Sequence, residues 1–114
     1  MTEIDVFITI SSTGDATYKS TNPMVQPDGT ITIDEGEDVA ITFSPDGETG
    51  QTWVFQSPWI TVVPEGGSVT IVSTTQNEVE IADNYPKGQP PSWYTYSLTT
   101  SAGILDPRLI NKGT

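Results

Sequence analysis

The chain has 114 residues, the length of a single domain with room for one modest hydrophobic core. It contains no cysteine and no histidine, which excludes thiol nucleophiles, disulfides, imidazole bases and the usual ligands of zinc, copper and haem iron. Fifteen acids and four bases give a net charge of −11, which repels nucleic acid phosphates and anionic membrane surfaces. We therefore expect no cofactor, and neither nucleic acid nor a membrane as a partner.

The N-terminal residues predict a cytoplasmic protein. The run Met1-Thr2-Glu3-Ile4-Asp5 carries two acids and has neither a basic n-region nor a long apolar stretch, so it is unlike a signal peptide. No segment approaches the roughly 20 apolar residues of a membrane span. The lack of cysteine also agrees with a reducing compartment.

Hydrophobic residues alternate with polar ones along most of the chain, and no window has the spacing of an amphipathic helix, which predicts an all-β fold. The first predicted strand covers residues 3–11, and a weaker segment at 16–21 is followed by two proline turns. Further strands are predicted at residues 30–33 and 38–43. The inward residues of the strand at 3–11 are Ile4, Val6, Ile8 and Ile10, and those of the strand at 38–43 are Val39, Ile41 and Phe43.

Residues 52–56 form the next predicted strand, with Trp53 and Phe55 on one face. Pro58 then interrupts the pattern, and proline cannot donate a hydrogen bond to a sheet. Residues 60–63 are therefore a bulged continuation of the same strand, an edge strand, or a strand that changes sheets.

The last third of the chain predicts a hairpin and two closing strands. Residues 68–74, with Val69 and Ile71 inward, and residues 77–82 read as a hairpin. Residues 83–92 hold three prolines and a glycine, which favours a long crossover loop. The closing strands are predicted at 93–98 and 106–111.

The acidic cluster between the third and fourth predicted strands is the first candidate site. Asp34, Glu35, Glu37 and Asp38 surround Gly36, and Ca²⁺ prefers hard oxygen ligands of this kind. The spacing is not that of an EF-hand, and alternation would point successive carboxylates in different directions. We interpret the cluster as a solvated turn, with a calcium site as the alternative.

Two further acids, Asp46 and Glu48, flank Gly47 in a second predicted turn. If both acidic loops met at one end of the sandwich, they could share a calcium ion. Glycoside hydrolysis would instead need two carboxyl groups about 5–10 Å apart, one with its pKa raised by burial. The dense acids all lie in turns, where solvent surrounds them, so we expect no enzyme.

The tryptophans form the second candidate site, because exposed aromatic rings on a small β-sandwich can stack on sugars. Trp53 lies in an apolar strand and is predicted to be in the core. Trp59 follows a proline at a strand break, and Trp93 begins a strand on the face opposite Tyr94 and Tyr96. We predict Trp59 and Trp93 as ligand-binding residues, whereas a tyrosine in a late strand is expected to hydrogen-bond to a connecting loop as a tyrosine corner.

The runs Ile31-x-Ile33, Val39-x-Ile41-x-Phe43 and Trp93-Tyr94-Thr95-Tyr96 are similar to patterns in cupredoxin-like and immunoglobulin-like sandwiches. Copper ligands are absent, so any cupredoxin likeness extends only to the scaffold. Within this group the chain resembles the small bacterial DP-EP family, immunoglobulin-like sandwiches of unassigned function. The resemblance rests on size, acidity and the strand that begins Asp106-Pro107, and the second dipeptide of that family, Glu-Pro, is not found near the end.

The resemblance and the strand spacing together predict one domain over residues 1–114. It is expected to be an immunoglobulin-like Greek-key β-sandwich of seven to nine strands. With no catalytic group in view, we expect a protein-interaction or assembly module, which could self-associate through edge strands or an aromatic patch. The alternative is a carbohydrate-binding module that uses its exposed tryptophans, with or without calcium.

Overall fold

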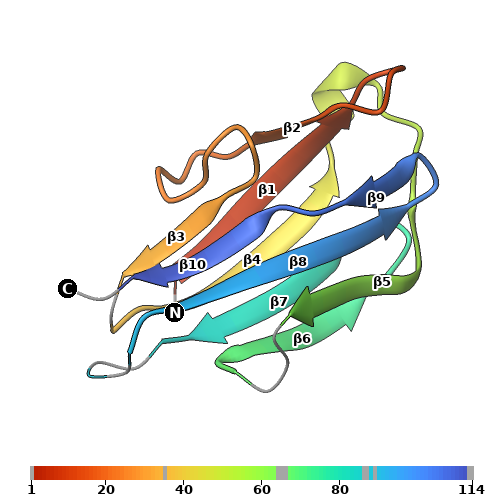
Figure 1. Cartoon of the computed structure of the whole chain (residues 1–114). Helices are drawn as coiled ribbons and strands as arrows, with labels where there is room; N and C mark the ends of the chain where they lie inside the picture. The colour runs from red at the N-terminus through yellow and green to blue at the C-terminus, as the bar shows by residue number, and fades with distance from the viewer. Residues whose placement is uncertain (1, 35, 64–66, 86–87, 89, 113–114) are drawn as a thin grey trace.

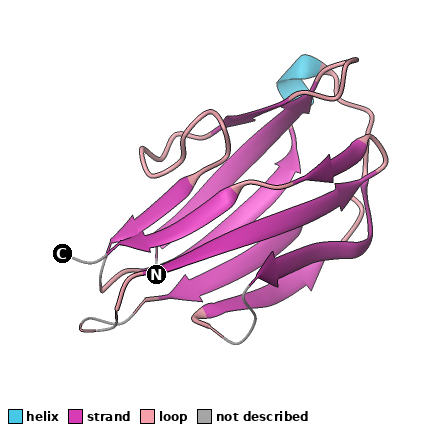
Figure 2. Cartoon of the chain, viewed as in Figure 1, coloured by secondary structure: helices cyan, strands magenta, loops and turns pink. Residues whose placement is uncertain are grey.

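The computed structural model describes residues 2–34, 36–63, 67–85, 88 and 90–112. Strands account for most of this part of the chain, and a three-residue 3₁₀ helix is the only helical element in it (Figure 2). The elements in chain order are β1 (Thr2–Ile10), β2 (Ala16–Lys19), β3 (Ile31–Asp34), β4 (Asp38–Pro45), η1 (Gly47–Thr49), β5 (Phe55–Val63), β6 (Val69–Thr74), β7 (Val79–Asn84), β8 (Ser92–Thr100), β9 (Gly103–Leu105) and β10 (Arg108–Lys112).

The strands form two sheets that lie face to face (Figure 1). Sheet A has the strand order β2-β1-β4-β7-β6, and sheet B has the order β3-β10-β8-β5, with β9 also paired to β8. Two pairs are parallel, β1 with β4 and β3 with β10, and the others are antiparallel. The predicted all-β sandwich is confirmed.

The two parallel pairs bear on the predicted connectivity. The sheets of an immunoglobulin sandwich are antiparallel, whereas both sheets here are mixed, so the immunoglobulin-like Greek-key order stays a prediction. The described residues form ten strands rather than seven to nine. The additional strand is β9, whose three residues were too few to show an alternating pattern.

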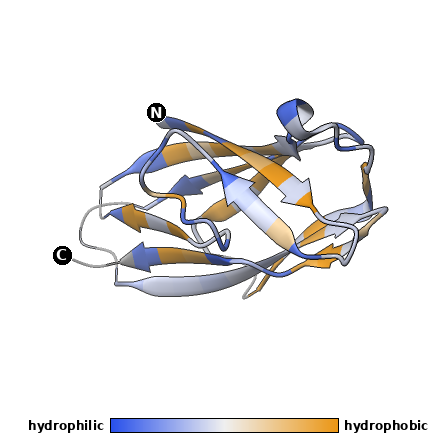
Figure 3. Cartoon of the chain, turned by 90° about the horizontal axis from the view of Figure 1, so that it is seen from above, coloured by the Kyte–Doolittle hydropathy of each residue, from blue (hydrophilic) through white to orange (hydrophobic). Residues whose placement is uncertain are grey.

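One hydrophobic core fills the space between the sheets. The inward residues predicted in β1 and β4 are buried there, and Trp53 and Phe55 lie beside them with their rings edge to face, 5.1 Å between centroids. Hydrophobic segments alternate with polar ones along the strands in Figure 3, as expected for strands with one buried face. The predicted core position of Trp53 is confirmed.

Two of the strand predictions concern the edges of the sheets. Residues 55–63 form one strand, β5, with a register shift between Phe55 and Ile60, and this strand is also the edge of sheet B. Ile71 was predicted to be inward, but its side chain is 52% exposed. The reason is that β6 is the edge of sheet A and has its own register shift after Ile71.

Both tyrosines of β8 bond to connecting segments, as expected for tyrosine corners. The Tyr96 hydroxyl donates to the Gly29 carbonyl oxygen at 2.7 Å, and the Tyr94 hydroxyl accepts from the Ser68 N–H at 3.2 Å. Burial raises the pKa of Tyr96 well above its ordinary value, so the hydroxyl stays a donor. Tyr96 thus fixes the loop of residues 20–30 to sheet B.

Replacing Tyr96 by phenylalanine is expected to lower the free energy of unfolding by about 1–3 kcal/mol, because the Gly29 carbonyl loses its buried donor. Urea denaturation monitored by tryptophan fluorescence measures the change. A variant as stable as the wild type would show that the loop does not depend on this bond.

In the part of the chain that the structure describes, no helix has the length and apolar character needed to cross a membrane.

Candidate functional site

The two tryptophans predicted to bind a ligand lie at different places on sheet B. Trp93 is 64% exposed near the start of β8. Trp59 is half-buried, packs against the core and has a positive φ of 68°. Ile60 pairs with Leu98, so Trp59 lies beside the far end of β8, about 20 Å from Trp93 at 3.3–3.4 Å per strand residue. They do not form one platform.

Trp93 instead lies on a patch of sheet B that we call the Trp93 face. Trp93 is paired with Ile110, which is paired in turn with Thr32, and this row crosses three strands. The neighbouring row holds Val63, Thr95 and Arg108. Directly opposed residues in neighbouring strands lie about 4.5–5.5 Å apart, and successive outward residues of one strand lie about 7 Å apart, so the two rows form one continuous surface.

The Trp93 face differs in chemistry from the outer face of sheet A. It combines a tryptophan, a 58% exposed valine, a half-buried isoleucine and an arginine. The outer face of sheet A carries the acids Glu3, Asp5 and Glu80 on β1 and β7, together with Phe7 and its pairing partner Lys19. In a chain of net charge −11 the Trp93 face is therefore a surface that presents apolar groups and a cation.

The acidic cluster forms the turn between β3 and β4. Asp34 ends β3, Asp38 begins β4, and the Glu37 N–H donates to the Asp34 carbonyl oxygen at 3.1 Å. Glu35 lies outside the described residues. Among the described acids, no group of three converges in a way that could hold a metal ion. A thermal-shift comparison in Ca²⁺ and in EDTA distinguishes the solvated turn from the calcium alternative, because a bound ion stabilises the fold.

The second acidic turn lies at the other end of the sandwich. Strand β4 separates the two turns, and its eight residues span roughly 26 Å. Asp46 is already engaged, since it accepts from the Glu48 N–H at 3.1 Å and lies 3.2 Å from the Lys19 ammonium. The condition set for a calcium site shared by the two loops is therefore not met.

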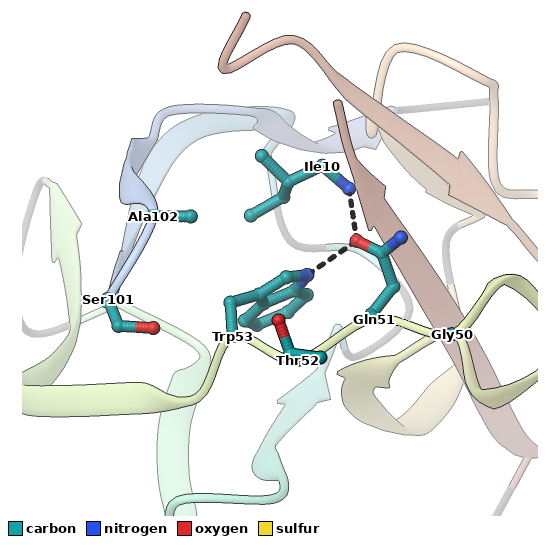
Figure 4. Close-up of a pocket in the computed structure, with 7 residues that line it drawn as sticks. All are labelled: Ile10, Gly50, Gln51, Thr52, Trp53, Ser101 and Ala102. Atoms are coloured by element: carbon teal, nitrogen blue, oxygen red, sulfur yellow. Dashed lines mark hydrogen bonds between the residues drawn. The ribbon is translucent and has the colours of Figure 1, made fainter. Parts of the chain in front are cut away.

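A cavity of about 330 Å³ opens beside Trp53 (Figure 4). The Gln51 side-chain oxygen accepts from the Ile10 N–H at 2.7 Å and from the Trp53 indole N–H at 2.8 Å. Ser101 also lines the cavity, and its hydroxyl accepts from the Val54 N–H at 3.0 Å. The described lining residues include no acid and no base, so they contain no pair suited to proton transfer.

A buried polar cluster joins the two sheets near the start of β8. Asp83 of sheet A and Asn111 of sheet B are both fully buried. One carboxylate oxygen of Asp83 accepts from the Ser68 hydroxyl at 2.5 Å and from the Asn111 side-chain N–H at 3.3 Å. The Asn111 amide also donates to the hydroxyls of Ser68 and Ser92.

Two oxygens of this cluster have no hydrogen-bond partner among the described residues, the second carboxylate oxygen of Asp83 and the Asn111 side-chain oxygen. Burial raises the pKa of the Asp83 carboxyl, and the bonds from Ser68 and Asn111 offset part of this effect. A proton on the second oxygen would supply the donor that the cluster lacks.

The sequence does not predict this cluster directly, because the prolines after Asp83 favour a crossover loop over residues 83–92. The alternation of inward and outward residues along the strands does indicate that Asp83 and Asn111 are buried. Asp83 continues the inward series Val79 and Ile81, and Asn111 follows the inward Leu109. Polar residues in inward register are the mark of a buried polar contact.

The chain matches no known family model, and no curated protein matches it in sequence. The likeness to the DP-EP family therefore rests on the residues quoted above.

Proposed function

We propose that this protein is a non-enzymatic interaction module that binds a protein partner through the Trp93 face. The observation that carries the proposal is the 64% exposure of Trp93 within a continuous row of side chains. Tryptophan and arginine are the residue types most enriched where binding energy concentrates, and Arg108 lies one row away from Trp93. A partner with an apolar centre and an acidic group beside it suits this surface.

The absence of cysteine and histidine from the sequence supports a role without catalysis. The cavity beside Trp53 supports it too, because its described lining offers hydrogen-bonding groups and no proton donor or acceptor of adjustable pKa. The acidity of the chain favours a protein partner over nucleic acid or an anionic membrane.

A photo-crosslinking amino acid placed at Thr95, in the centre of the Trp93 face, tests the proposal in cells that carry the native gene. We expect one discrete adduct, and no such adduct from the same group at Thr42 on the outer strand face of sheet A. With the partner purified, Trp93→Ser is expected to weaken binding about 30-fold, the effect of losing a side chain worth about 2 kcal/mol.

The fold of Trp93→Ser should be intact, since an exposed substitution changes stability by about 0.5 kcal/mol or less. Phe7→Ser, on the outer face of sheet A, is the matched control and should bind as the wild type does. Equal adducts from Thr42 and Thr95, or undiminished binding by the folded Trp93→Ser variant, would contradict the proposal.

A carbohydrate ligand is the second candidate, favoured by the hydroxyl of Thr95, the next outward residue of β8 after Trp93, and by that of Thr32, which lies across Ile110 from the indole. Sugars stack on exposed aromatic rings and hydrogen-bond to neighbouring polar groups. We expect the fluorescence of Trp93 to change with a bound oligosaccharide, and a flat response across a glycan panel removes this candidate. Trp59 would not share the ligand, because it lies at the other end of β8.

We also propose membership of the DP-EP family, an immunoglobulin-like scaffold and a cytoplasmic location. Asp106-Pro107 directly precedes β10, which supports the first two proposals, and a cysteine-free composition supports the third. Homologous sequences should keep the dipeptide at this position if the family assignment is correct. Fractionation of cells that carry the native gene tests the location.

A further inference from the structure

An edge strand of a sheet has one side with no ladder partner. Sheet A ends at β2 and β6, and sheet B ends at β3 and β5, while the three-residue β9 of sheet B is paired only with β8 among the described residues. Backbone N–H and C=O groups on such a side can pair with another chain, so natural proteins cover, charge or distort their edges.

Three of these edges are protected. The loop of residues 20–30 covers two of them, because the Tyr18 N–H of β2 donates to the Pro27 carbonyl at 3.1 Å and the Thr32 N–H of β3 donates to the Met24 carbonyl at 3.0 Å. On β5, Pro58 lacks an N–H and the register shifts along the strand. Figure 1 shows the loop of residues 20–30 beside β2 and β3.

Strand β6 lacks most of these protections. The sequence from residue 66 to residue 77 contains no charged residue and no proline. Within β6, Ile71 and Val72 are 52% and 54% exposed. Among the described residues, β7 is the only strand paired with it, and no loop backbone bonds to its outer side. The bulge after Ile71 is the single distorting feature.

We propose that β6 pairs edge to edge with β6 of a second copy of this chain, antiparallel and about a two-fold axis. Pairing a strand with itself is isologous, so one free edge supplies both partners. This pairing would bring the exposed Ile71 and Val72 of each copy to the contact between the two copies, which removes apolar surface from water.

Charge also favours this contact between copies. Each copy has a net charge of −11, so two copies repel wherever charged surfaces meet. The uncharged stretch at residues 66–77 lets two copies approach with little repulsion, whereas pairing two Trp93 faces would bring one arginine toward the other. A pair of six-residue strands is smaller than the roughly 800 Å² per partner of a stable interface, so we expect a weak, reversible dimer. The inference is independent of the partner proposed for the Trp93 face.

Sedimentation equilibrium over a range of protein concentrations tests the pairing. Raising salt from 0.1 to 1 M shortens the Debye length from about 10 to about 3 Å and should strengthen the dimer. Ile71→Lys is expected to weaken it about tenfold or more, because two lysines then lie close together in the pairing. Phe7→Lys brings the same charge change on another face and should not weaken it.

A second readout does not depend on affinity. The chain has no cysteine, so single-cysteine variants at Thr70, Ile71 and Val72 can form disulfides only between copies. At least one of them should oxidise to a covalent dimer faster than Phe7→Cys does. If the protein is a monomer at every concentration in 1 M salt, the proposal is overturned, and β6 would then be free to pair with a strand of a different protein. A dimer that the folded Ile71→Lys variant still forms with unchanged affinity overturns the proposal as well.

Discussion

Replacing Gly29 by alanine is expected to lower the free energy of unfolding by about 3 kcal/mol. Gly29 has a φ of +90°, where an L side chain is strained. A Cβ atom built there would lie 2.8 Å from Pro107 Cβ and 2.8 Å from the Tyr18 ring. The strain and the overpacking each cost about 1–3 kcal/mol, and urea denaturation measures their sum.

Gly47→Ala is the matched control, because no atom lies within 4 Å of its built Cβ and its φ is outside the left-handed region. We expect that variant to stay within about 0.5 kcal/mol of the wild type. Equal stability of the two alanine variants would mean that the loop of residues 20–30 shifts at little cost, and that it does not hold the edges of β2 and β3 as described.

Local alternation was sufficient to predict most strands and the direction of many side chains. The buried face of β1 and the exposure of Trp93 both follow from period two in a strand with one buried face. These features depend only on neighbouring residues, so a single sequence contains them.

What depends on distant segments could not be predicted. The parallel pairing of β1 with β4 joins strands more than 30 residues apart, and β9 exists because three residues return against β8. The exposure of Ile71 follows from the edge position of β6, which is a property of the whole sheet. The separation of the two acidic turns likewise depends on which end of β4 each one occupies.

The candidate site was predicted in part for the same reason. Alternation placed Trp93 on the outer face, but only the pairing of β8 with β10 and β5 shows that Ile110, Arg108 and Val63 surround it. Trp59 could not be judged from sequence, because its positive φ and its contact with the core are set by tertiary packing.

Replacing Asp83 by asparagine is expected to stabilise the protein by about 1–3 kcal/mol near pH 8, the cost of a buried group left without a partner. The asparagine keeps one acceptor oxygen for Ser68 and brings an NH₂ donor in place of the oxygen that has no described partner. It also removes a charge that is fully buried between the two sheets. Urea denaturation of both proteins from pH 4 to pH 9 measures the difference.

The sign of the pH dependence follows from the raised pKa of Asp83 in the folded state. The folded protein holds this proton more tightly than the unfolded chain, so the contribution is complete below the unfolded pKa of about 3.9 and is lost as pH rises through the folded pKa. The advantage of Asp83→Asn should therefore grow with pH and then level off. The exposed control Asp5→Asn should change stability by about 0.5 kcal/mol or less. If Asp83→Asn were instead equally destabilising at pH 4 and at pH 9, the stability contributed by Asp83 would come from its hydrogen bonds and not from protonation of its carboxyl group.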